Sequence, residues 1–115
     1  MTIELLFFTL MGVRVYMELQ NVLTKVEQRY KETSDFLRKT NARECPEAYY
    51  KAQGMNEVFM GAISRQHSVN LETVKDQLAE RTVFLASLRE TSDIEKQQGA
   101  VEALEFIAKL LEERT

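Results

Sequence analysis

A short pattern occurs twice in this chain. Lys51–Phe59 and Lys96–Leu104 share the sequence Lys-x-Gln-Gly-x-x-Glu-x-apolar. Each copy places a glycine inside a stretch with helical periodicity, where glycine costs about 1 kcal/mol relative to alanine. Two glycines in the same context therefore predict two helices that approach each other closely. We expect the crossing at Gly54 and Gly99, with polar contacts at its edge from Gln53, Glu57, Gln98 and Glu102.

Two alternatives stay open for this repeat. The glycines could be surface positions where a missing side chain is simply tolerated. The repeat itself is either the trace of a duplicated hairpin or a coincidence. Because no similarity extends beyond the pattern, convergence is the simpler interpretation.

Helical periodicity dominates most of the chain. Apolar residues recur at steps of three and four from residue 19 onward, and a single proline with four glycines in 115 residues favours long helices. The predicted helices run from residue 17 to about 40, from 46 to 65, from about 71, and from the break at 90–93 to the end. Their short connections are typical of antiparallel neighbours. The sequence therefore predicts an all-α fold, an antiparallel bundle of about four helices arranged as two helix hairpins.

Local signals mark the helix starts. Pro46 suits the first turn of a helix, because its missing N–H would have no partner there. Asn70 or Ser68 can cap the third helix. Ser92, followed three residues later by Glu95, predicts a capping box for the fourth helix.

Residues 1–16 form the most apolar stretch of the chain. The run is too short for a membrane span of about 20 apolar residues, and it lacks the basic start of a signal peptide. We expect either a non-native extension upstream of a natural start at Met17, or a segment that docks on the core or on a second subunit. Residues 17–115 are then expected to form a single helical domain.

Composition and residue types argue against several functions. The net charge of −3 gives no basic patch for nucleic acid. The chain contains a single histidine, His67, and a single cysteine, Cys45, so one subunit holds neither a histidine pair for a metal nor a disulfide. No glycine-rich loop follows a strand to hold phosphate. We expect no catalytic residues, no cofactor and no metal, and therefore not an enzyme.

Helix surfaces are the remaining candidates for function. Small residues at 54, 58 and 61 predict a shallow groove along the second helix, and the fourth helix has a broad apolar face. A domain of this size buries only about two-thirds of its unfolded surface, so we expect a homodimer or a higher homo-oligomer. The residues expected at this interface are Tyr50, Met55, Phe59, Val101, Leu104, Ala108 and Leu111.

The stretches Tyr49–Gly54 and Gln98–Leu104 give the chain a resemblance to the small, acidic, all-helical accessory proteins of bacteriophages and prophages. That resemblance implies a non-enzymatic role in virion assembly or in modulating a host machine, through helix contacts with protein. It places the chain in the bacterial cytoplasm or in the virion. The alternative function is a regulator or inhibitor of a host or phage nucleic-acid enzyme or defence protein.

Overall fold

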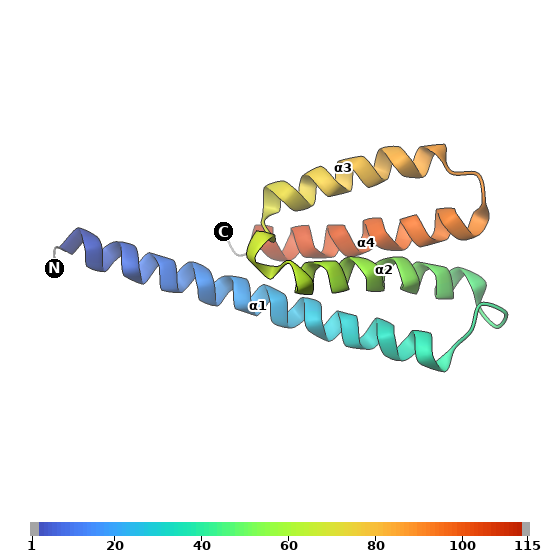
Figure 1. Cartoon of the computed structure of the whole chain (residues 1–115), viewed down its shortest axis with the longest axis horizontal. Coiled ribbons are helices and arrows are strands. Elements are labelled where there is room, and N and C mark those ends of the chain that lie inside the picture. Colours follow the sequence, from blue (N-terminus) through green and yellow to red (C-terminus); the bar gives the residue numbers. More distant parts are fainter. Residues whose placement is uncertain (1–2, 114–115) are drawn as a thin grey trace.

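The computed structural model describes the backbone of residues 3–113 and the side chains of residues 17–66 and 68–113. Over this range the chain consists of helices joined by short connections, without a strand (Figure 1), and the all-α bundle prediction is confirmed. The elements are α1 (Ile3–Lys39), α2 (Pro46–Ser64), the 3-10 turn η1 (Gln66–Ser68), α3 (Leu71–Ser87) and α4 (Thr91–Glu113).

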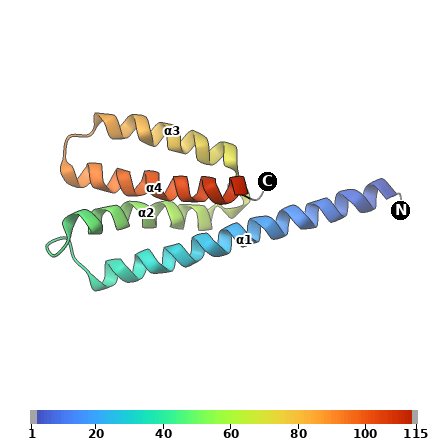
Figure 2. The same ribbon diagram turned by 180° about the vertical axis from the view of Figure 1, so that it is seen from behind.

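Successive helices run antiparallel and form two hairpins, α1 with α2 and α3 with α4. The two hairpins meet through α2 and α4, which lie between the outer helices α1 and α3 (Figures 1 and 2). Because one helix separates them in sequence, α2 and α4 run in the same direction. The closest helix pair is therefore parallel and does not belong to one hairpin.

The core lies where all four helices contribute side chains. Its largest fully buried members are Val26 of α1, Phe59 of α2, and Leu104, Ile107 and Leu111 of α4. Helix α4 supplies most of the core because it packs between α2 and α3. Helix α3 contributes one buried side chain, that of Val74.

The helix ends test the boundary predictions. Asn70 caps α3, since its side-chain oxygen accepts a hydrogen bond from the Thr73 backbone N–H at 2.9 Å. Pro46 opens α2 as predicted. The capping box at Ser92 is wrong, because α4 already begins at Thr91 and the Ile94 N–H donates to the Glu90 carbonyl, which leaves Ser92 inside the first turn.

Helix α1 starts well before Met17. Its backbone is helical from Ile3, so the expected leader and the first helix of the domain form one continuous element, which extends past the other helices (Figure 1). The side chains of residues 1–16 lie outside the described residues. Met17, the first described side chain, is 60% exposed, whereas Val22 and Val26 are buried.

A polar contact fixes α1 on α2. The half-buried Asn56 amide donates hydrogen bonds to the Thr33 hydroxyl at 2.9 Å and the Ser34 hydroxyl at 2.8 Å. It also approaches the Tyr30 carbonyl oxygen at 3.4 Å. These three acceptors lie on consecutive turns of α1, so Asn56 sets the position of α2 along the outer helix.

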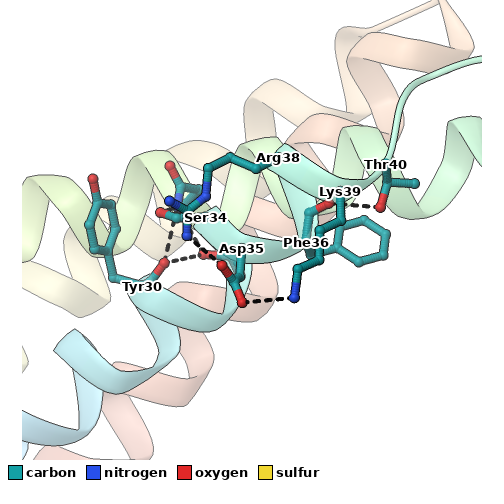
Figure 3. A network of polar contacts seen from close by, with 9 residues as sticks. Tyr30, Ser34, Asp35, Phe36, Arg38, Lys39 and Thr40 are labelled. Carbon is teal, nitrogen blue, oxygen red and sulfur yellow. Dashed lines mark hydrogen bonds and ion pairs between the residues drawn. The ribbon is translucent and has the colours of Figure 1, made fainter.

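Asp35 organises the exposed C-terminal end of α1 (Figure 3). Its carboxylate accepts hydrogen bonds from the Lys39 ammonium at 3.3 Å and from the Arg38 guanidinium. The hydrogen bond from Lys39 is the larger cause and the one from Arg38 the second, and together they hold the pKa of the Asp35 carboxyl below its ordinary value of 3.8. These contacts favour the ionised carboxylate.

We expect this lowered pKa to give a defined pH dependence. A carboxylate whose pKa is lower in the folded state stabilises the fold above its unfolded pKa, and the contribution is lost as the pH falls through the folded pKa. Lys39→Gln should therefore raise the pKa of Asp35 towards 3.8, as measured by NMR titration of its carboxyl carbon. The matched control Lys25→Gln should leave that pKa unchanged, and an equal rise in the control would contradict the assignment to Lys39.

Candidate functional site

Helices α2 and α4 meet backbone to backbone at Gly54 and Gly99. A Cβ atom built on Gly54 would lie 1.8 Å from the Lys96 carbonyl oxygen, and one built on Gly99 would lie 2.0 Å from the Lys51 carbonyl oxygen. Both obstacles are main-chain atoms, so no change of rotamer could relieve the clash. The helices can reach this separation only with glycine at both positions.

The charged residues of the repeat pair across the same crossing. The Lys96 ammonium lies 2.9 Å from the Glu57 carboxylate, and the Lys51 ammonium lies 3.8 Å from the Glu102 carboxylate. Each copy's lysine therefore contacts the other copy's glutamate. The repeat is complementary to itself, and a local pseudo-two-fold axis relates the two helices.

Sequence reasoning named the glutamates of this crossing but not the lysines. The signal was present, because lysine is the first residue of both copies of the pattern. Gln53 and Gln98 are half-buried beside the glycines. Among the described contacts, neither glutamine side chain forms a hydrogen bond, so the ion pairs supply the polar edge.

The residues expected at a homo-oligomeric interface occupy a different place. Four of the seven are buried within the single chain, at 8% exposure or less: Phe59, Leu104, Ala108 and Leu111. The other three, Tyr50, Met55 and Val101, are half-buried. The close approach of α2 and α4 seals their apolar faces inside one molecule. The four buried side chains are therefore core residues and offer no surface to a second copy in this conformation.

A groove remains open on the other side of the pair, between α2 and α3. It encloses about 540 Å³. Helices α2 and α3 form its walls, and Leu104 and Ile107 of α4 lie at its floor. The α2 wall includes Val58, Gly61 and Ala62. A volume of this size falls within the range of binding pockets.

Gly61 faces the open space of the groove. A Cβ atom built at this position would meet nothing within 4 Å, in contrast to Gly54 and Gly99. On the α3 wall the groove reaches Phe84, which is 52% exposed, and the neighbouring Val83 is 75% exposed. The largest exposed apolar surface of α3 therefore adjoins the groove.

Charged side chains line the rim of the groove. Arg65 follows the last residue of α2, Glu80 lies on α3, and both side chains are exposed. Arg81 is fixed, because its guanidinium donates a hydrogen bond to the Gln97 side-chain oxygen at 2.9 Å. An apolar floor with charges at its edge is suited to binding the apolar face of an amphipathic partner.

The cysteine and the possible metal ligands among the described residues point to no second site. The Cys45 thiol is free and half-buried at the start of α2, and the described residues hold no cluster of ligands that could bind a metal ion. The side chain of His67 lies outside the described residues. Among the described residues, no helix is both long enough and apolar enough to cross a membrane. Comparisons with protein-family models, with curated proteins and with solved structures each found no match.

Proposed function

We propose that this chain is a non-enzymatic protein-interaction module, and that the groove between α2 and α3 binds one amphipathic helix of a partner protein. The observation that carries the proposal is the open apolar groove itself, with Leu104 and Ile107 at its floor and Gly61 in its wall. Leu104 and Ile107 are only 2% and 1% exposed and lie at the base of the groove, whereas the half-buried Val58, Ala62 and Val69 form its accessible apolar wall.

The shape of the groove favours a helix as its occupant. Its α3 wall extends from Thr73 to Phe84, which corresponds to about 16 Å, or three helical turns. Two antiparallel helices form its walls and a third forms its floor. A partner helix can lie along this direction and bury an apolar stripe, which is the helix-in-groove mode of recognition.

The rim charges favour one orientation of the partner. Arg65 lies near the end of the groove that Thr73 marks, whereas Glu80 lies closer to Phe84. A complementary helix would carry an acidic residue at the Arg65 end and a basic residue about two turns away, beside Glu80. Exposed charges of this kind contribute more to specificity than to affinity.

The broader biological role stays a prediction. A phage-type accessory protein would use such a groove to hold a virion component or a host protein. A regulator of a nucleic-acid enzyme or defence protein would use it in the same way. A second copy of this chain would need a surface other than the four buried residues of the expected interface, and α3 exposes two adjacent large apolar side chains, Val83 and Phe84.

Blocking the groove tests the proposal. We suggest selecting a displayed library of amphipathic helical peptides, about 18 residues long, against the folded protein. Selected peptides should bind wild type and lose at least about tenfold in affinity for Gly61→Leu. The Cβ atom of the added side chain enters open space, and leucine is a better helix former than glycine. We therefore expect the variant to stay folded, which its urea unfolding curve checks.

The matched control is Met60→Leu, at an exposed neighbouring position outside the groove. Peptide affinity for this variant should equal that of wild type. The proposal fails if the library yields no binder, or if Gly61→Leu and Met60→Leu bind the selected peptides equally well.

A further inference from the structure

The pseudo-two-fold arrangement of the hairpins pairs the groove with a filled site on the opposite side of the molecule. The axis that exchanges α2 and α4 also exchanges α1 and α3, so the α2–α3 groove corresponds to the seam between α4 and α1 (Figures 1 and 2). Counting ten residues from the lysine of each repeat gives Gly61 on α2 and Phe106 on α4. These two residues hold equivalent places.

Phe106 fills the seam on the α1 side. Its ring packs edge-to-face against Phe59, with ring centroids 5.9 Å apart and an interplanar angle of 83°. The guanidinium of Arg29, from α1, lies over the same ring at 5.3 Å from its centroid. An apolar core side chain and a cation from the outer helix therefore hold an aromatic ring between them.

The groove offers the same kinds of group around an empty place. Gly61 leaves open space where Phe106 stands on the other side. Leu104 occupies the position equivalent to Phe59 in the repeat and lies in the groove. Arg81, from the outer helix α3, also lines the groove and is held there by Gln97.

We propose that the partner's helix inserts an aromatic side chain over Gly61, in the place that Phe106 fills on the α1 side. This inference rests on the proposed function and specifies the anchor residue of the partner. The missing Cβ lets the ring approach the α2 backbone. The half-buried Val58 and Ala62 supply the apolar contact, with Leu104 and Ile107 at the base of the groove, and the Arg81 guanidinium supplies the cation. The half-exposed ring of Phe84 offers a further edge for aromatic packing.

Small probes test the anchor directly. We suggest titrating the protein with N-acetyl-phenylalaninamide and, separately, with N-acetyl-leucinamide, and following the methyl resonances of Val74, Leu104 and Ile107. The phenylalanine probe should shift these signals in a saturable way and bind roughly two- to fivefold more tightly than the leucine probe. Gly61→Phe should abolish the shifts by filling the site from within, and Gly61→Leu provides a second blocked variant.

The outcomes separate the two proposals. Equal affinity for both probes at the three methyl groups would overturn the aromatic anchor and leave the groove as a general apolar docking site. Shifts that persist in both blocked variants would also overturn it. If wild type sediments as a dimer and Gly61→Phe sediments as a monomer, the occupant is a second copy of this chain and the assignment to a different protein is wrong. The proposed function itself fails on a different result, namely that the selected helical peptides bind Gly61→Leu as tightly as wild type.

Discussion

Replacing Gly54 with alanine is expected to lower the free energy of unfolding by more than about 3 kcal/mol. The new methyl group would lie 1.8 Å from the Lys96 carbonyl oxygen, so α2 and α4 would have to separate along the whole crossing. Gly99→Ala should cost a similar amount, since its Cβ would lie 2.0 Å from the Lys51 carbonyl oxygen. Urea unfolding followed by circular dichroism measures both effects.

Gly61→Ala is the matched control, because this glycine is also helical but faces open space. There the substitution should raise the free energy of unfolding by about 0.5–1 kcal/mol, through improved helix propensity. If the same glycine-to-alanine substitution changes the free energy of unfolding in opposite directions at the two kinds of site, the difference isolates the contribution of the crossing. A neutral result at both Gly54 and Gly99 would mean that the two helices do not meet at these residues.

Phe59→Ala should produce the second large effect, a loss of about 3–5 kcal/mol in the free energy of unfolding. The Phe59 side chain is completely buried and packs edge-to-face on Phe106. Its removal leaves a cavity between α2 and α4 and takes away the surface that positions Phe106 beneath Arg29. Chemical denaturation gives the magnitude, and near-ultraviolet circular dichroism reports the loss of ordered aromatic packing.

Phe84→Ala is the comparison for this prediction, since that ring is half-exposed. Its loss should cost less than about 1 kcal/mol. If Phe59→Ala is as mild as Phe84→Ala in the monomer but weakens self-association, Phe59 belongs to an interface between copies, as the sequence first indicated.

The helices could be predicted from the sequence because their signals are local. Apolar spacing, Pro46 and the Asn70 cap each act within a few residues, and the observed starts of α2 and α3 coincide with them. The close α2–α4 contact at Gly54 and Gly99 also left a signal, since a glycine inside a helix is costly unless something requires it. The predicted cap at Ser92 placed the start of α4 two residues too late, which is within the usual uncertainty of helix ends.

Properties set by the packing of distant helices could not be predicted. Leu104 and Leu111 form an apolar face in the sequence, and nothing local distinguishes a face buried by α2 from one buried by a second copy. Gly54 and Gly61 are spaced alike for a groove, but one faces α4 and the other faces solvent. Seven residues separate them, so both lie on nearly the same face of α2. The difference therefore depends on how far α2 and α4 have diverged at each position, which only the assembled bundle determines.

The thin attachment of α3 has a consequence for motion. Val74 is its only buried side chain, and α3 packs mainly on α4. Such a helix can open locally at a free energy well below that of global unfolding. Its amide hydrogens should therefore exchange with solvent sooner than those of α4. One wall of the groove can then move outward while the α2–α4 pair stays intact, so the width of the groove can adapt to the side chains of the helix that enters it.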